Sequence, residues 1–288
     1  AKKLDDAGVV RSPTGLVLAM LLRRVRGDLK AGTYEFIKAE SGRGIIARLV
    51  RGDTEPTDIS VTFPEGFTLE QVAARLDARG LTTKDAFSAA ANVGRFRDEF
   101  SVLASVQGTE SLEGYLFPDT YRFHRGTSTE DMIRRLLRRF AEQWEVALTE
   151  TRTEKPTSSV HDVVTMASIV EREVTSPEDR RLVAGILWKR LDLGIGLDAD
   201  ATIRYVLNDW ERPLTVDDLR VDSPYNTRRY RGLPPGPIGN PGLESLKAVL
   251  APTPSDYLYY LSASDDGRTI FSKTLDEHRQ AKTQYLRP

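Results

Sequence analysis

The chain has 288 residues, of which 40% are hydrophobic and 29% charged, and its formal net charge is −1. These values are typical of a globular protein with one large domain or two smaller ones, and they exclude an overall attraction to nucleic acid or to an anionic membrane. The sequence has no cysteine, which excludes disulfides, and its three histidines lie too far apart to predict a metal site. No apolar run approaches the roughly 18 residues of a membrane-spanning helix.

A short sequence near the N-terminus recurs later in the chain. Leu4-Asp-Asp-Ala-Gly-Val9 resembles Leu76-Asp-Ala-Arg-Gly-Leu81, and each copy precedes a helical pattern, over residues 16–22 and 84–91. A strand is expected before the second copy, whereas the first copy begins too close to residue 1 to have one. We therefore expect the natural protein to continue upstream, with the chain beginning inside a first repeat. The alternative is a chance likeness between two helix ends.

The first third of the sequence alternates between expected strands and short helices. Alternation predicts strands over residues 32–37 and 59–63, and apolar spacing predicts a helix over residues 44–50. Thr68 is the expected N-cap of another helix. Residues 1–108 are accordingly expected to form a small α+β module.

A long amphipathic helix is expected after an irregular, aromatic-rich segment over residues 112–123. Residues 129–147 carry apolar side chains at helical spacing, and the basic run Arg-Arg-Leu-Leu-Arg-Arg lies within them at residues 134–139. Basic runs occur in nucleic-acid-binding proteins, but this one alternates with the apolar stripe of the helix. It is therefore expected to be the solvated face of a helix that packs on the core.

One glutamate lies in the middle of an apolar helix face. Residues 159–174 form a helical pattern in which Glu171 falls within about 40° of Ala167, among the valines of the apolar arc. Burial there would disfavour the ionised carboxylate, raise its pKa and retain a proton for general acid catalysis. The alternative is a structural ion pair with an arginine of a neighbouring element. Arg172 and Glu173 are expected to point to the other side of the helix.

Short helices and a turn-rich loop follow. The expected helices, with Asp200 and Asn240 as N-caps of two of them, span residues 176–194, 200–207, 216–219, 240–250 and 274–285, and a hairpin joins residues 256–261 and 268–272. Residues 223–242 are rich in proline and glycine, and long ordered loops in compact domains are often functional. Tyr225 offers a ring on which a sugar could pack. A linker is the alternative, which the core-like flanking elements disfavour.

Four blocks occur in the order known from one protein family. They are Leu112-Glu-Gly-Tyr-Leu-Phe-Pro-Asp-Thr-Tyr121, Ala167-Ser-Ile-Val-Glu-Arg-Glu173, Leu197-Asp-Ala-Asp-Ala-Thr202 with Tyr205, and Tyr225-Asn-Thr227 with Gly232-Leu-Pro-Pro-Gly-Pro-Ile238. On these blocks the chain resembles the YceG-like, or MltG, family of membrane-anchored endolytic murein transglycosylases. Its first third is similar to the family's LysM-like module.

The resemblance implies an α+β fold. A small LysM-like α+β module for glycan binding (residues 1–108) precedes a mainly helical catalytic domain (residues 109–288) with a β-hairpin and a long Pro/Gly-rich loop. The implied partners are peptidoglycan glycan strands and membrane-bound cell-wall synthesis proteins, with no nucleic acid and no metal or organic cofactor. Family members carry one N-terminal transmembrane helix, so the resemblance implies a single-pass protein of the bacterial inner membrane with this region on the extracytoplasmic side.

The resemblance also implies a site. The family's catalytic glutamate matches Glu171. The substrate-binding positions expected from the matching blocks are Glu113, Tyr115, Ser168, Asp200, Thr202, Tyr225, Asn226, Thr227 and Pro234. The chain departs from the family's usual Leu-Gln-x-Asp-Pro-Thr, because Asp198 stands for the glutamine and Ala201 for the proline. These two changes are expected to alter the part of the substrate cleft that this block forms and to leave the catalytic chemistry unchanged.

The family cleaves the β-1,4 bond between N-acetylmuramic acid and N-acetylglucosamine without water. The implied role of protonated Glu171 is to donate to the leaving oxygen, after which its carboxylate takes the proton of the muramyl C6 hydroxyl, and that oxygen closes a 1,6-anhydro ring. Such cleavage of nascent strands would terminate their elongation. Two alternatives remain open: a hydrolase of the same bond in which Glu113 or Asp200 holds a water, and a non-catalytic glycan-binding scaffold.

Two expectations about stability follow from the same patterns. Glu171→Gln is expected to preserve stability or raise it, because an amide removes the burial cost of a charge. Asn226→Ala is expected to change stability little, because a loop side chain carries little core packing. Glu173 is expected to be the harmless neighbour of the catalytic acid.

Overall fold

The computed structural model describes residues 4, 9–10, 12–22, 25, 27–32, 34, 36, 41–52, 58–107, 110–154, 156–174, 176–264 and 267–286. Contacts divide the chain into two compact units. The first consists of residues 1–60 with 122–126, and the second of residues 61–121 with 127–288. The second unit holds the candidate site.

The first unit contains the helices α2 (Pro13–Leu22) and α3 (Gly42–Arg51). Gly52 closes α3 in the left-handed conformation, which glycine adopts without strain. The small core between the two helices consists of Leu16, Met20, Ile45 and Ile46. The helix expected over residues 44–50 is thus confirmed, whereas half of the strand expected over residues 32–37 lies outside the described residues.

The two copies of the short repeat end in the same kind of turn. The carbonyl of Leu76 accepts the N–H of Leu81 at 3.1 Å, and the carbonyl of Leu4 accepts the N–H of Val9 at 2.9 Å. A bond of this span closes a helix in the Schellman motif. The helices that follow the two turns are α2 and α5 (Lys84–Ala90). Both copies thus have the same backbone hydrogen bond, which favours a true repeat over a chance likeness.

A two-stranded sheet and a capped helix begin the next part of the chain. Strand β1 (Asp58–Thr62) pairs with β2 (Thr120–His124). Helix α4 (Leu69–Ala78) starts in a capping box, in which the hydroxyl of Thr68 accepts the N–H of Gln71 and the side chain of Gln71 accepts the N–H of Thr68. The sequence predicted β1 and this cap, but it predicted only an irregular segment where β2 lies.

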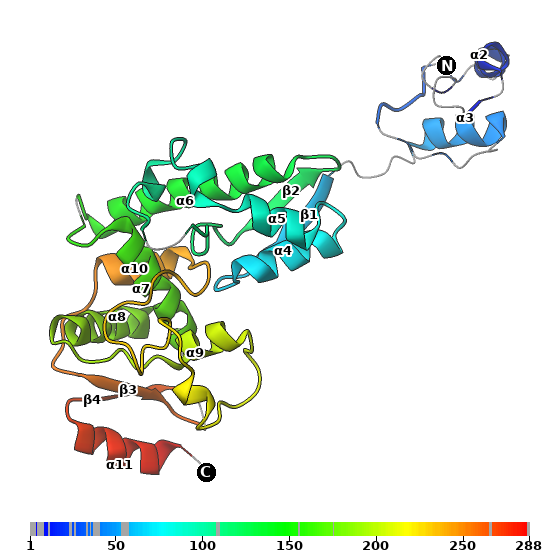
Figure 1. Ribbon diagram of the computed structural model, residues 1–288. Coiled ribbons are helices and arrows are strands. Elements are labelled where there is room, and N and C mark those ends of the chain that lie inside the picture. Colours follow the sequence, from blue (N-terminus) through cyan, green and yellow to red (C-terminus); the bar gives the residue numbers. More distant parts are fainter. Residues whose placement is uncertain are drawn as a thin grey trace. The chain divides into compact units, whose positions relative to one another are not determined.

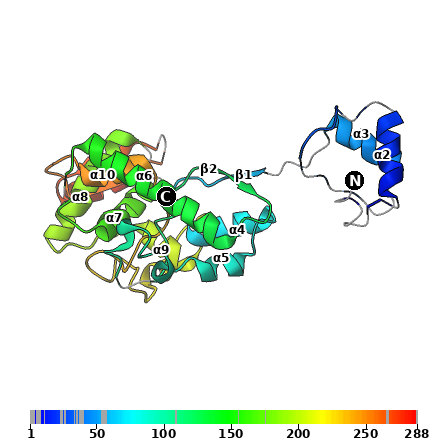
Figure 2. The ribbon, with the colours of Figure 1, turned by 90° about the horizontal axis from the view of Figure 1, so that it is seen from above.

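Helix α6 (Thr129–Thr151) is the longest helix of the second unit and contacts both α5 and α10 (Leu243–Leu250) (Figures 1 and 2). Its basic residues lie on the exposed side. Arg134 pairs with Glu99 and Arg139 with Asp119, at 2.9 and 2.8 Å. The basic run is thus the solvated face that its spacing predicted.

Helices α7 (Val160–Glu173), α8 (Pro177–Asp192) and α10 pack on one another beside α6 (Figure 1). The remaining elements are α9 (Asp200–Leu207), the 3₁₀ turns η1 (Val93–Arg95), η2 (Ser101–Leu103) and η3 (Asp218–Arg220), the antiparallel strands β3 (Tyr259–Ser262) and β4 (Thr269–Ser272), and α11 (Leu275–Tyr285), which packs on that hairpin. Sequence periodicity predicted the long helices and the hairpin within a few residues.

Two predicted helix caps are wrong. Ala199 is the N-cap residue of α9 and Gly242 that of α10, and neither helix has a side-chain cap. The side chain of Asp200 pairs with Arg228 instead. The side chain of Asn240 bonds to backbone groups of distant segments. Both polar side chains therefore bond to groups that are far away in the sequence, which the local sequence could not reveal.

The two compact units meet at residue 60, whereas the sequence predicted a joint near residue 108. Residues 61–107 join the second unit because the N–H of Gly66 donates to the carbonyl of Asn240, and that of Asn240 to the carbonyl of Phe67, both at 2.8 Å. The roles predicted for residues 1–108 and 109–288, glycan binding and catalysis, stay predictions. Among the described residues, no helix is both long enough and apolar enough to cross a membrane.

A pair of glycine substitutions tests how closely the turn-rich loop packs on the rest of the second unit. Gly114 and Gly126 have φ of 89° and 86°, so alanine at either position is strained by about 1–2 kcal/mol. A Cβ at Gly114 would overlap Pro237, whereas a Cβ at Gly126 has open space. In urea unfolding, Gly114→Ala should therefore lose about 1–3 kcal/mol more than Gly126→Ala. Equal losses would contradict the close packing.

Candidate active site

Glu171 lies near the C-terminal end of α7, and its side chain is only 5% exposed. Arg180 of α8 donates from Nη2 to Oε1 at 2.8 Å, and the N–H of Gly242 at the start of α10 donates to Oε2 at 2.9 Å. Three helices thus meet at one carboxylate. The predicted burial is confirmed, and the arginine partner is the one that the alternative interpretation expected.

The short connection between α7 and α8 places Arg180 over Glu171. Helix α8 begins at the N-cap Ser176, followed by Pro177 at the first helical position, as the sequence predicted. Arg180 lies one turn into the helix, and its Nε donates to the carbonyl of Val174 at 3.2 Å. The guanidinium is thereby held at the end of α7 by both a carbonyl and a carboxylate.

A second carboxylate, that of Glu65, lies beside Gly242 at the same place. A Cβ at Gly242 would overlap the Glu65 side chain. Burial raises the pKa of Glu65 from its ordinary value, and the negative charge of Glu171 raises it further. Sequence reasoning did not select Glu65. The sequence feature that could have indicated Glu65 is the turn Pro-Glu-Gly-Phe, which directly follows an expected strand.

Glu113 is a third buried acid, 6% exposed. The N–H of Leu69 donates to both of its oxygens, at 2.8 and 3.0 Å, and the hydroxyl of Tyr205 donates at 3.4 Å. Desolvation raises the pKa of Glu113 to about 8, against the opposing effect of these hydrogen bonds. At neutral pH this group therefore holds a proton.

Glu113 lines a cavity of about 390 Å³. The rings of Tyr205 and Tyr225 lie 5.1 Å apart, tilted by 43°, and form an aromatic wall. The other lining residues are Thr68, Glu70, Val206, Asn208 and Ser223. Two of the predicted substrate-binding residues, Glu113 and Tyr225, are therefore brought together, with an aromatic pair of the kind that packs on sugar rings.

Glu173 is not a solvated residue, contrary to its position on the helical wheel. The hydroxyl of Tyr260 donates to its Oε2 at 3.1 Å. Desolvation raises the pKa of Glu173 to about 7, opposed by this hydrogen bond. Glu173 lines a cavity of about 410 Å³ together with Asp200 and Arg190. Tyr260 of β3 therefore reaches Glu173 on the side of α7 that the helical wheel assigned to solvent.

Three predicted site residues are buried and support the fold. The hydroxyl of Tyr115 lies 3.0 Å from Nδ1 of His161, inside the core. Ser168 donates to the carbonyl of Thr165 and accepts the N–H of Ile238 at 3.0 Å, which fastens the turn-rich loop to α7. Pro234 is buried in the same loop. These residues position the surroundings of the site.

Asn226 is fully buried, which contradicts its expected role as a loop side chain with little packing. Its Nδ2 donates to the carbonyls of Leu219 and Val221 at 3.1 and 2.8 Å. Its Oδ1 accepts the N–H of Arg228 at 3.1 Å. The asparagine thus fixes the start of residues 223–242.

Thr202 and Thr227 are buried as well, and their hydroxyls lie 3.1 Å apart. They tie α9 to the turn-rich loop. Asp200 is half-exposed and accepts from Nη2 of Arg228 at 2.6 Å. Asp198, one of the two departures from the family pattern, pairs with the buried Arg190. The wall that carries these departures therefore lies at the cavity beside Glu173.

Comparisons with known proteins agree on one family. The model of the YceG-like family matches residues 1–284. The endolytic murein transglycosylase of Bacillus subtilis is 36% identical over 267 residues, which cover 89% of this chain and 73% of that protein. The endolytic murein transglycosylase of Streptococcus pneumoniae strain R6 is 29% identical over 308 residues and 98% of this chain. This chain spans only 55% of the length of that streptococcal relative.

The fold also has a solved counterpart. A crystal structure of a yceG-like protein from Listeria monocytogenes matches with a TM-score of 0.67 and 34% sequence identity. The match covers 97% of this chain and 93% of the other. The α+β fold inferred from the sequence is thereby confirmed.

Replacing Asn226 with alanine should lower stability. The change removes three part-buried hydrogen bonds, to two carbonyls and one N–H, and a typical hydrogen bond contributes about 0.5–1.5 kcal/mol. Tyr230→Phe is the matched control, because it removes an exposed hydrogen bond to Asp222 from the same loop. Thermal melts should show a clear decrease for Asn226→Ala and almost none for Tyr230→Phe. Equal melting temperatures for the two variants would contradict the stabilising role of Asn226 in the loop.

Glu113 should make stability depend on pH. Its pKa in the folded chain, about 8, is above its ordinary value, so the folded state keeps a proton that the unfolded state has released. The stabilisation is complete below about pH 4.5 and disappears as the pH rises towards 8. Glu113→Gln, which is neutral throughout, should melt at progressively higher temperature than the parent between pH 5 and 9. A difference in melting temperature that stayed constant from pH 5 to 9 would contradict the prediction.

Proposed function

The chain belongs to the YceG-like family, and on that premise we propose that it is an endolytic murein transglycosylase, as its bacterial relatives are named. The observation that carries the proposal is the buried carboxylate of Glu171, held by Arg180 and by the N–H of Gly242. The substrate is peptidoglycan, and the bond that breaks is the β-1,4 linkage between N-acetylmuramic acid and N-acetylglucosamine. The product carries a 1,6-anhydro-muramyl end.

The reaction needs one carboxyl group in two protonation states. Protonated Glu171 donates its proton to the bridging oxygen as the bond from that oxygen to C1 of the muramyl residue breaks. The resulting carboxylate then takes the proton of the C6 hydroxyl of the same residue, and O6 bonds to C1. Glu171 gives one proton to the leaving sugar and gains another from the C6 hydroxyl, so the enzyme is unchanged and no water is consumed.

Arg180 and Glu65 are suited to assist these two steps in opposite ways. The guanidinium of Arg180, 2.8 Å from Glu171, stabilises the carboxylate after the proton has left. The neighbouring carboxyl group of Glu65 favours keeping a proton within the cluster, because two adjacent negative charges repel each other. Neither group replaces Glu171 as the acid.

The cavity between Glu113 and the Tyr205–Tyr225 pair is the proposed place for a sugar ring next to the reacting bond. Pyranose rings pack their C–H faces on aromatic rings, and hydroxyl groups of the cavity fix the orientation. The protonated carboxyl of Glu113 would donate a hydrogen bond there. In a hydrolase, the same group would have to hold a water molecule as an anion, for which its pKa of about 8 is unfavourable.

Glu173 is a second candidate for the acid, and one observation favours it. A pKa of about 7 is close to the value that a general acid needs at neutral pH, and the group faces a cavity. Against it stands the position of Glu171 in the family's catalytic block. If Glu171 is the acid, the Glu171→Gln variant should be inactive. If Glu173 is the acid, the Glu173→Gln variant should be inactive instead.

The place of action is outside the cytoplasm, because peptidoglycan is a cell-wall polymer. Attachment to the inner membrane by a helix upstream of residue 1, association with membrane-bound cell-wall synthesis proteins and termination of growing strands belong to the proposal as well. Their support is the resemblance of the four sequence blocks to a membrane-anchored family.

Glu171→Gln should abolish the release of anhydro-muropeptides from purified peptidoglycan. General acid–base assistance amounts to about 10²–10⁴-fold, and one group here supplies both steps. Stability should fall, contrary to the expectation from sequence, because the amide leaves Arg180 buried without its anion. Circular dichroism must show that the variant is folded at the assay temperature.

Glu173→Gln is the matched control on the same helix and should retain most of the activity. If Glu173→Gln were the inactive variant, the acid would be Glu173. Product masses decide between reaction types, because anhydro ends are lighter than reducing ends by one water. Reducing ends from the parent protein would establish a hydrolase, and no soluble fragments at all would leave only a binding scaffold.

A further inference from the structure

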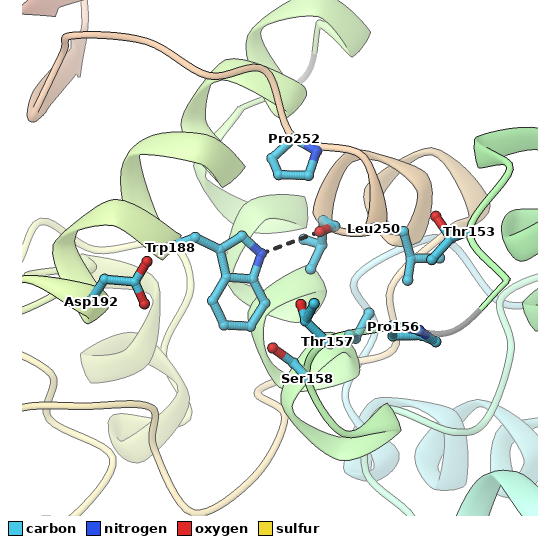
Figure 3. A pocket seen from close by; sticks show the side chains of 10 residues that line it. Thr153, Pro156, Thr157, Ser158, Trp188, Asp192, Leu250 and Pro252 are labelled. Atoms are coloured by element: carbon cyan, nitrogen blue, oxygen red, sulfur yellow. Dashed lines mark hydrogen bonds between the residues drawn. The ribbon is translucent and has the colours of Figure 1, made fainter.

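A third cavity of the second unit is lined by none of the carboxyl groups discussed above. Its volume is about 350 Å³, within the range of small-molecule sites. Figure 3 shows the indole of Trp188 at the centre of the residues that line it. They are Thr153, Pro156, Thr157, Ser158, Val163, Trp188, Asp192, Val249, Leu250 and Pro252.

The indole of Trp188 is held in a fixed orientation. Its Nε1 donates to the carbonyl of Val249 at 3.2 Å, so the ring is tied to the end of α10 (Figure 3). Pro156 and Pro252 stiffen the two segments that flank it. The side chain is only half-buried, although tryptophan gains much free energy from full burial. A rigid, partly open aromatic ring beside a cavity is suited to stacking a ligand.

The polar residues of this cavity define the chemistry of the ligand. Asp192 is the one charged side chain among the described residues that line it, and it has an exposed carboxylate. The hydroxyls of Thr153, Thr157 and Ser158 both donate and accept hydrogen bonds. A carboxylate repels anionic ligands and accepts strong hydrogen bonds from hydroxyls. A neutral ligand with many hydroxyls and an apolar face meets all of these conditions.

We propose that the Trp188 cavity is a second, non-catalytic glycan-binding site, which takes an N-acetylhexosamine unit of a peptidoglycan strand. The choice of peptidoglycan among carbohydrates rests on the proposed function. The sugar stacks its C–H face on the indole, Asp192 accepts from a ring hydroxyl, and Thr157 and Ser158 bond to the remaining polar groups.

The site lies about two helical turns from the carboxylate of Glu171. On α7, eight residues separate Val163 from Glu171, and on α8 eight residues separate Arg180 from Trp188. At 1.5 Å per residue both spans amount to about 12 Å. Helix α10 connects the same two places, since its N-terminus bonds to Glu171 and its C-terminal turn bonds to Trp188. A strand bound at Trp188 is thus held at a fixed distance from Glu171 without reaching it.

Tryptophan fluorescence with chitotetraose, a β-1,4-linked tetramer of N-acetylglucosamine, tests the proposal. The chain has three tryptophans, Trp144, Trp188 and Trp210. In a Glu171→Gln background, which prevents turnover, the ligand should change the emission, and Trp188→Phe should remove that change while Trp210→Phe keeps it. Trp188→Ala should weaken binding by about tenfold or more, as is usual for a central tryptophan contact.

Asp192→Asn is the variant that leaves the packing of the tryptophan intact. It removes an exposed charge and should weaken binding several-fold with an unchanged melting temperature, which keeps the test valid even if Trp188→Ala fails to fold. An emission change that originates from Trp210, equal affinities for all variants, or no binding of chitotetraose would each overturn the Trp188 site. None of these results touches the proposed function, which fails only if the parent protein releases no anhydro-muropeptides.

Discussion

The arrangement of the second unit depends on the buried side chain of Asn240, which is 1% exposed. Its Oδ1 accepts the N–H of Leu116 at 2.8 Å, and its Nδ2 donates to the carbonyl of Phe67 at 2.7 Å. One amide therefore joins three segments that are far apart in the sequence. Leaving either backbone partner unsatisfied in the interior would cost about 1–3 kcal/mol. Because Gly242 follows two residues later, the same contacts determine where its N–H meets Glu171.

The protein gives its buried glutamates different electrostatic environments. Glu113 and Glu173 have little compensating charge, so desolvation dominates and raises their pKa values to about 8 and about 7. Glu171 lies beside Arg180, which donates to it, and beside Glu65, whose pKa is raised by burial and by the charge of Glu171. A group that first donates and then accepts a proton needs both states within reach. A single strong partner would favour one step and oppose the other.

Sequence patterns predicted the features that depend on neighbours within one turn. The N-cap Ser176, the capping box at Thr68 and the apolar face that buries Glu171 are of this kind. The patterns failed where distant segments decide. From the sequence alone, Asn240 could either cap a helix or bond to distant segments. Only the packed structure shows that it bonds to distant segments. Glu65 and β2 escaped prediction for the same reason, since their partners lie elsewhere in the chain. Asn226 is different, because it bonds to residues 219, 221 and 228, and only the folded turn shows that the side chain points inward to reach them.

The departure from the family pattern at Asp198 is explained by the residue with which it pairs. Arg190 is 5% exposed, and a guanidinium so buried requires an anion. Asp198 supplies it, and its φ of 54° is a conformation that aspartate tolerates better than most residues. The glutamine that the family usually has at this position is uncharged and would not neutralise Arg190. With Asp198 paired to Arg190 and Asp200 to Arg228, the charged wall of this cavity is neutralised within itself, which leaves desolvation as the main control on the pKa of Glu173.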